Sequence, residues 1–223
     1  MKEDFLRGVA FILEGDTEKV FYLALLEHFC KKHSGWELIK INDPKLGEVY
    51  YALMSEERNI VIKIFVVGTI SQLAHSGTWF ENRCHKAYPS LKWTVFLCYD
   101  TDDYMPNITK FYEGDWDELR KRLAKSKPHE VVDLAAQADI EDIMLLDCDG
   151  IFKFLGIAPC PIPTGSKGKR KMKRLFRLLG PGSAYHEGMR AKELIDALDL
   201  DLIIKSAPLD FQKIEKACFF EME

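Results

Sequence analysis

Short apolar runs alternate along the first two thirds of the chain with segments whose apolar residues recur every three or four positions. Runs rich in β-branched residues are typical of buried strands, and the three-to-four period is typical of amphipathic helices. The predicted strands cover 8–13, 36–41, 60–67, 93–99 and 130–134, and the predicted helices cover 16–33, 42–56, 69–87, 116–125 and 140–146. This alternation predicts an α/β fold with a mostly parallel sheet and helices on both faces, joined by right-handed crossovers.

The last quarter of the chain has a different character. A proline-rich connector, Pro159-Cys160-Pro161-Ile162-Pro163, is stiff and extended, so no helix can continue through it. It predicts a boundary between a sheet-containing domain, 1–158, and a small helical C-terminal subdomain, 164–223. Within the second part, a basic segment with seven lysines and arginines between Lys167 and Arg177 is followed by two further amphipathic segments at 191–198 and 209–220.

The composition is that of a globular protein of one domain or one domain plus a subdomain. The chain has 223 residues, 47% of them hydrophobic, and a net charge of −4, so no global positive field draws it to nucleic acid or to anionic lipid. No apolar run approaches the roughly 18 residues of a membrane span, and the N-terminus lacks the features of a secretory signal. The six cysteines form no CxxC pair, which favours reduced thiols. We therefore expect a cytoplasmic protein without a membrane partner.

Acidic residues follow two of the predicted strands. Glu14 ends the first strand, with Glu18 one helical turn later, and Asp100 and Asp102 end the strand at 93–99. In a parallel sheet, ligands bind outside the carboxyl ends of the strands, so these carboxylates are expected to face one crevice. Glu141 and Asp142, at the start of a later helix, form a third acidic group. Such oxygen ligands suit Mg²⁺ or Mn²⁺, and two ions could clamp the attacking and leaving oxygens of a phosphodiester.

A purely structural interpretation of these acids stays open. Carboxylates near helix N-termini are common because they complement the helix dipole. For Glu14, and for the pair Glu141 and Asp142, this interpretation is about as strong as metal binding. For Asp100 and Asp102, ligation is favoured, since neighbouring carboxylates would otherwise repel each other.

Two of these motifs carry a family resemblance. The segment Glu14-Gly15-Asp16-Thr17-Glu18, after an apolar strand, together with Tyr99-Asp100-Thr101-Asp102-Asp103, resembles the TOPRIM domain of topoisomerases, primases and OLD-type nucleases. The form of the first motif is more similar to the OLD-like and RloB-like nucleases of prokaryotic phage defence. The resemblance implies a TOPRIM-like sheet, with Glu14 as metal ligand or general base and Asp100 and Asp102 as metal ligands. It also implies that Glu141 or Asp142 supports a second ion.

The basic segment is the one strong local anion site that the sequence predicts. Its residues could hold a nucleic-acid backbone, and the resemblance implies that one lysine, for which Lys167, Lys169 and Lys171 are candidates, assists catalysis. The predicted nucleic-acid-binding residues are Lys167, Lys169, Arg170, Lys171, Lys173 and Arg174. The alternative is a solvated helical face that neutralises acidic neighbours.

Together these features predict a Mg²⁺- or Mn²⁺-dependent nuclease acting on DNA or RNA, as an effector of phage defence. The alternative function is a catalytically inactive TOPRIM-like module that serves a partner ATPase or toxin. The chain lacks the ATPase domain of OLD nucleases, so an ATPase partner would be a separate protein, and a homodimer is left open.

Overall fold

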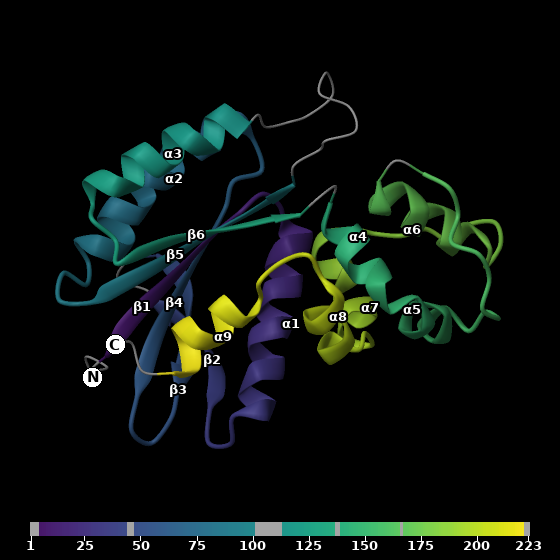
Figure 1. Ribbon diagram of the computed structural model, residues 1–223, viewed down its shortest axis with the longest axis horizontal. Coiled ribbons are helices and arrows are strands. Elements are labelled where there is room, and N and C mark those ends of the chain that lie inside the picture. Colours follow the sequence, from purple (N-terminus) through teal and green to yellow (C-terminus); the bar gives the residue numbers. More distant parts are fainter. Residues whose placement is uncertain (1–4, 44–46, 101–112, 137–138, 166, 221–223) are drawn as a thin grey trace.

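The computed structural model describes residues 5–43, 47–100, 113–136, 139–165 and 167–220 (Figure 1). A six-stranded sheet of order β2-β3-β4-β1-β5-β6 lies at its centre. The strands are β1 (Arg7–Leu13), β2 (Glu37–Asp43), β3 (Glu48–Met54), β4 (Asn59–Val66), β5 (Lys92–Asp100) and β6 (Glu130–Ala136). The helices are α1 (Asp16–Lys32), α2 (Ile70–Trp79), α3 (Glu113–Lys125), α4 (Ile140–Met144), α5 (Cys148–Leu155), α6 (Gly168–Arg177), α7 (Lys192–Asp196), α8 (Leu200–Ser206) and α9 (Gln212–Phe219).

The sheet is mixed but mostly parallel. The central strand β1 pairs in parallel with β4 and β5, and β5 pairs in parallel with β6. Strand β3 is antiparallel to both β2 and β4. The predicted α/β class with a mostly parallel sheet is thus confirmed.

Helices cover both faces of the sheet. Alternate residues of β1 belong to two different hydrophobic clusters, as the two-residue period of a strand requires. Phe11 packs with α1 on one face, where its ring stacks 5.2 Å from Phe96, whereas Ile12 packs with α2 and α3 on the other. All seven residues of β1 are buried, including Arg7 at its start, and the strand is without a polar side chain from Gly8 to Leu13.

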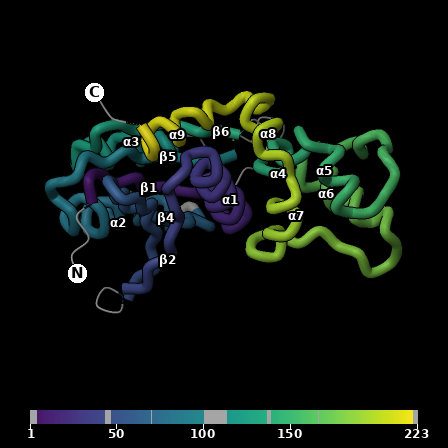
Figure 2. Tube along the Cα trace, turned by 90° about the horizontal axis from the view of Figure 1, so that it is seen from below, coloured from purple at the N-terminus to yellow at the C-terminus, as the bar shows by residue number. Residues whose placement is uncertain are grey.

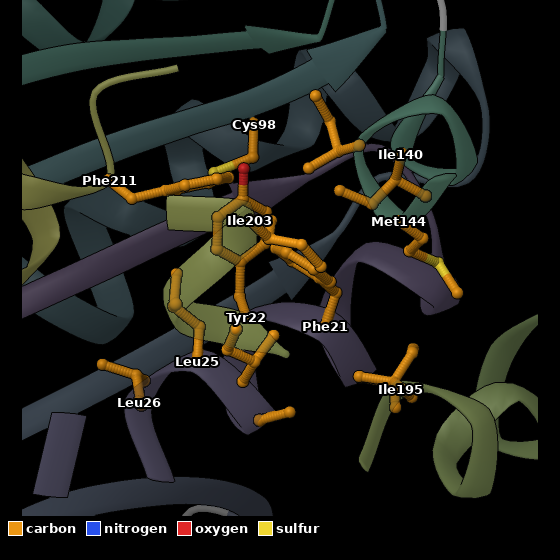
Figure 3. Packing of buried hydrophobic residues seen from close by; sticks show 14 of the residues in the cluster. Phe21, Tyr22, Leu25, Leu26, Cys98, Ile140, Met144, Ile195, Ile203 and Phe211 are labelled. Carbon is orange, nitrogen blue, oxygen red and sulfur yellow. The ribbon is translucent and has the colours of Figure 1, made fainter. Parts of the chain in front are cut away.

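The C-terminal helices extend the cluster on the α1 face. Phe211, just before α9, lies against Tyr22 of α1 with ring centroids 6.2 Å apart (Figure 3). Ile195 of α7 and Ile203 of α8 are buried in the same cluster. Helices α5 and α6 lie at the far end of the molecule from α2 and α3 (Figure 2). Residues from both sides of the proline-rich connector therefore share one hydrophobic cluster.

The predicted helix at 42–56 is wrong, because this segment contributes the end of β2 and the whole of β3, joined in an antiparallel hairpin. Tyr50 packs on the α2 face, whereas Tyr51 and Leu53 pack on the α1 face, which is the period of a strand. Gly47 has a φ of 60°, the left-handed conformation of a turn residue. The aromatic residues of this segment fit a sheet surface, because Tyr51 pairs with Ile62 of β4 and Tyr50 with Ile41 of β2.

The other predicted elements of the sheet domain are present, and two helices in the described regions were not predicted. Helix α5 begins where the Asp147 carboxylate accepts a hydrogen bond from the Gly150 N–H, and α8 begins at the equivalent cap made by Asp199. Both helices are short, with seven or eight residues, so each shows barely two turns of apolar periodicity. None of the described helices has the length and apolar character needed to cross a membrane.

Candidate active site

A cavity of about 440 Å³ opens at the carboxyl ends of β1 and β5. The chain leaves β1 into α1 on one face and moves after β5 to α3 on the other, so this is the point where the strand order reverses. The strand arrowheads point here toward α4 and α6 (Figure 1). The charged lining residues are Glu14, Asp16, Glu18, Asp100, Asp139, Glu141, Lys167, Lys169 and Glu187.

Glu14 and Asp100 are joined directly. The Glu14 Oε2 atom accepts a hydrogen bond of 3.1 Å from the backbone N–H of Asp100. The Asp100 Oδ1 atom is buried and has no hydrogen-bond partner among the described residues. Burial, followed by the charges of Glu18 and Glu14, raises the pKa of Asp100 well above its ordinary value. An anionic Asp100 therefore lacks the compensation that a buried carboxylate requires.

Glu18 lies in the first turn of α1 and is buried. A Cβ atom at Gly15 would lie 2.8 Å from its Oε2 atom, so glycine at this position leaves room for the carboxylate beside the helix N-terminus. The next contact comes from the C-terminal part of the chain, where the Gly188 N–H donates to Thr17 Oγ1 at 2.9 Å. The first turn of α1 is thus held by a hydrogen bond from the C-terminal part of the chain.

Glu141 is held by a tyrosine that the sequence analysis did not select. The Tyr185 hydroxyl donates a hydrogen bond of 2.9 Å to Glu141 Oε1, and both side chains are buried. Burial, with the nearby Asp139 charge, raises the pKa of Glu141 to about 8, although the bond from Tyr185 acts in the opposite direction. Without a bound cation, the burial of Glu141 therefore favours its protonated form.

Helices α4 and α6 meet end to end beside the cavity. Asp139 caps α4 and also accepts a hydrogen bond from the Lys169 N–H at 3.1 Å. Asp142 accepts from the Gly168 N–H at 2.8 Å and pairs with the Lys171 ammonium at 2.6 Å. A Cβ atom at Gly168 would lie 2.2 Å from the Asp142 nitrogen, so only glycine permits this approach. Both oxygens of Asp142 are therefore occupied within the protein.

The basic residues divide into two groups. Lys167 and Lys169 line the cavity, and Lys169 also pairs with Glu187, which lies 3.3 Å from the Lys173 ammonium. Arg174 donates to the backbone oxygen of Thr164. The remaining predicted nucleic-acid-binding residues, Arg170, Lys171, Lys173 and Arg174, lie on α6 outside the cavity lining.

The structure thus brings Glu14, Glu18, Asp100 and Glu141 into one cavity but places Asp142 at the helix junction. Asp102 lies outside the described residues. The sequence analysis did not select Asp139, Tyr185 or Glu187. An aspartate before the apolar start of a helix is a recognisable capping signal and could have indicated Asp139. No local pattern distinguishes Tyr185 or Glu187, because the fold alone carries them to the cavity.

The charged side chains of the cavity that could bind a metal ion are all carboxylates, and their oxygen atoms suit Mg²⁺ or Mn²⁺. In the described part of the chain, no three His, Cys, Asp or Glu side chains are arranged as a preformed metal-binding group. Mg²⁺ usually binds through one or two carboxylates and keeps several waters, so a preformed group of three is not required. The unpartnered Asp100 Oδ1 atom and the carboxylates around it therefore fit a hydrated divalent cation.

No protein-family model matches the chain, and no curated protein matches it. Among solved structures, a futalosine hydrolase mutant of Helicobacter pylori aligns over 95% of this chain and 98% of its own, with 11% identity and a TM-score of 0.29. The 5'-methylthioadenosine/S-adenosyl homocysteine nucleosidase of Campylobacter jejuni aligns over 96% and 98%, with 13% identity and a TM-score of 0.30. Similarities this weak indicate nothing about the function of the chain.

Proposed function

We propose that the protein is a Mg²⁺- or Mn²⁺-dependent nuclease that hydrolyses phosphodiester bonds in cytoplasmic DNA or RNA. The observation that carries the proposal is the unpartnered buried oxygen of Asp100, surrounded by Glu14, Glu18 and Glu141 in one cavity. So many carboxylates around a buried acid are costly unless a cation neutralises them. The resemblance of the two acidic motifs to TOPRIM nucleases is an independent support, and it also suggests the role of a phage-defence effector.

Four carboxylates of the cavity have distinct roles in this proposal. A bound divalent cation would stabilise negative charge on the phosphate and lower the pKa of a coordinated water. Asp100 and Glu18 would hold the cation, and Glu141, fixed by Tyr185, would complete the acidic shell. Glu14, oriented by the Asp100 N–H, would accept the proton of the attacking water.

In this proposal, the lysines at the cavity bind the nucleic-acid substrate. Lys167 and Lys169 would contact phosphate oxygens, because metal-binding carboxylates alone would repel a polyanion. In the absence of substrate, the Glu187 carboxylate pairs with Lys169 and Lys173. A substrate phosphate would take the place of that carboxylate. Asp142 and Lys171 would act only by holding α4 against α6.

The test is cleavage of plasmid DNA, single-stranded DNA and bulk tRNA with Mg²⁺, Mn²⁺ or EDTA. We expect metal-dependent cleavage that the Asp100→Asn variant loses, while Asp210→Asn, a matched change at an exposed site, retains it. Folding of both variants is checked by thermal unfolding. Activity that survives in Asp100→Asn would remove the central assignment. No cleavage together with no Mn²⁺-induced change in melting temperature would instead favour the inactive binding module.

A further inference from the structure

Two adjoining hollows lie at the end of the sheet opposite the acidic cavity, beside the amino ends of β5 and β6. One has a volume of about 470 Å³ and the other about 390 Å³, and His85 lines both. Their charged lining comprises Lys86, Lys92, Arg122, Lys125 and Lys127, against a single carboxylate, Glu81. We call these five basic residues the basic surface. Its excess of positive charge contrasts with the net charge of −4 of the whole chain.

Three of the five basic residues have no ion-pair or hydrogen-bond partner in the described part of the chain. Lys86 pairs with Glu81 at 2.6 Å, and Arg122 lies 3.3 Å from Glu118. The ammonium groups of Lys92, Lys125 and Lys127 are exposed, and the described part of the chain provides no ion pair or hydrogen bond for them. On α6, by contrast, Lys169, Lys171 and Lys173 are each paired with a carboxylate. The lysines of α6 are thus engaged with carboxylates, whereas Lys92, Lys125 and Lys127, like Arg170 and Arg177 of α6, have no carboxylate partner among the described residues.

The backbone at Lys127 is a second indication. Its φ is 48°, in the left-handed region, and no other described residue except glycine has a positive φ. Lys127 follows the end of α3, a position that glycine or asparagine usually occupies because other residues are strained there. Strained residues of this kind cluster at functional sites. Here the strained position presents a lysine to the hollow.

We propose that the basic surface binds the phosphate backbone of the nucleic acid on which the acidic cavity acts. The choice of polyanion rests on the proposed function, which this inference deepens. None of the large hydrophobic side chains that are exposed in the described structure lines either hollow. A membrane-binding or protein-binding surface would present such side chains at its centre. Binding to phosphate requires only the positive charge that is present.

The distance between the basic surface and the acidic cavity sets a minimum length for a substrate that contacts both. Lys92 and Asp100 are the first and last residues of β5, so eight strand steps of about 3.3 Å separate them by about 26 Å. At 3.4 Å per nucleotide of a duplex strand, that distance corresponds to roughly eight nucleotides. A shorter substrate can enter the acidic cavity without reaching the basic surface.

The test compares two triple variants with equal charge. One carries Lys92→Gln, Lys125→Gln and Lys127→Gln. The control carries Lys153→Gln, Lys205→Gln and Lys213→Gln, at exposed positions on α5, α8 and α9. Binding of fluorescein-labelled 24-nucleotide DNA duplex and 24-nucleotide RNA is measured by anisotropy in EDTA, at several salt concentrations. Hydrolysis of bis(p-nitrophenyl) phosphate with Mn²⁺ is measured in parallel, because this small diester reports the cavity alone.

We expect the first variant to bind at least one labelled nucleic acid at least tenfold more weakly than the wild type. For duplex DNA, the slope of log affinity against log salt should fall by about 2.7 for three lost phosphate contacts. The control variant should match the wild type in both respects.

Equal affinity and slope for the two variants, or no binding by the wild type, would overturn the proposal. So would a loss of diester hydrolysis in the first variant alone, since the lysines would then support the cavity. Binding without diester hydrolysis by any form would leave this surface supported and count against the nuclease assignment.

Discussion

Asp100 ends β5 with a buried carboxylate oxygen that no described group reaches, and the charges of Glu18 and Glu14 surround it. We expect Asp100→Asn to raise the melting temperature in EDTA at neutral pH, because it removes a carboxylate whose burial beside Glu18 and Glu14 is costly. A gain of about 1 kcal/mol would correspond to a rise of roughly 2–4 °C. Thermal unfolding by circular dichroism measures the change. A lower melting temperature would mean that the Asp100 charge is compensated within the protein.

Glu141 makes the stability of the protein depend on pH. Its pKa in the folded protein is about 8, against an ordinary value of 4.5, so the folded state holds a proton that the unfolded state releases. This contribution is complete below about pH 4.5 and is lost as the pH rises toward 8. In EDTA, the free energy of unfolding should therefore fall over this window, by at most about 1.4 kcal/mol per pH unit from this group.

The matched variants are Glu141→Gln, which retains an acceptor for Tyr185, and Glu193→Gln, at an exposed position of α7. Urea unfolding between pH 5 and pH 8 should show a smaller fall for the first variant and an unchanged fall for the second. Parallel curves for the wild type and Glu141→Gln would contradict the assignment.

At the level of elements, the β2–β3 hairpin is attached to the central sheet by a buried ion pair. Lys63 of β4 is completely buried, its ammonium lies 3.0 Å from Glu48 Oε2, and it stands 4.3 Å from the centre of the Tyr50 ring. Glu48→Ala should destabilise the protein by about 3–5 kcal/mol, because it leaves a buried cation without its counter-ion. Lys63→Met should cost less, since Glu48 is 16% exposed and can be hydrated. Denaturant unfolding of both variants checks this order, and the reverse order would contradict it.

The junction of α4 and α6 depends on one glycine. A Cβ atom at Gly168 would collide with the backbone of Asp142 at 2.2 Å. Gly168→Ala should therefore cost about 1–3 kcal/mol and displace Lys167 and Lys169 from the cavity. Gly114→Ala is the matched control, because its Cβ would meet open space in α3 and should stabilise the helix slightly. Thermal unfolding and cleavage assays together test the junction. A Gly168→Ala variant with normal stability would show that the helices can move apart freely.

The sequence predicted those elements whose own residues determine them. The strands β1, β4 and β5 have long apolar runs, and α1 has many turns of regular spacing, so local pattern was sufficient. The hairpin strand β3 was mistaken for a helix. Its residues alternate between the two faces of the sheet, but this alternation is evident only once β2 and β4 are known to flank it. Glu14, Glu18 and Asp100 could be grouped from strand ends alone. Tyr185 and Glu187 could not, since they arrive through contacts such as Gly188 with Thr17, 171 residues apart in the chain.

Across the whole molecule, the two ends of β5 carry opposite charge. The carboxyl end presents the acidic cavity and the amino end presents the basic surface. A polyanion is repelled by the first and attracted by the second, so the orientation of a long substrate is biased before it reaches the cavity. If nucleic acid binds as proposed, the basic surface lowers the concentration of long substrate that the cavity requires.

Cleavage should therefore depend on substrate length. The wild-type value of kcat/KM should rise as DNA or RNA substrates are lengthened from four to about sixteen nucleotides, because those longer than roughly eight can span the about 26 Å between the two sites. The increase should lie in KM rather than kcat, since contacts remote from the reacting bond that are made equally in the bound and transition states change binding alone. The variant with Lys92, Lys125 and Lys127 changed to glutamine should cleave short substrates like the wild type and show no gain with length. Raising the salt concentration should abolish the gain in the wild type and leave the variant nearly unchanged. A length dependence that is identical in the two proteins would mean that long substrates leave the cavity in another direction.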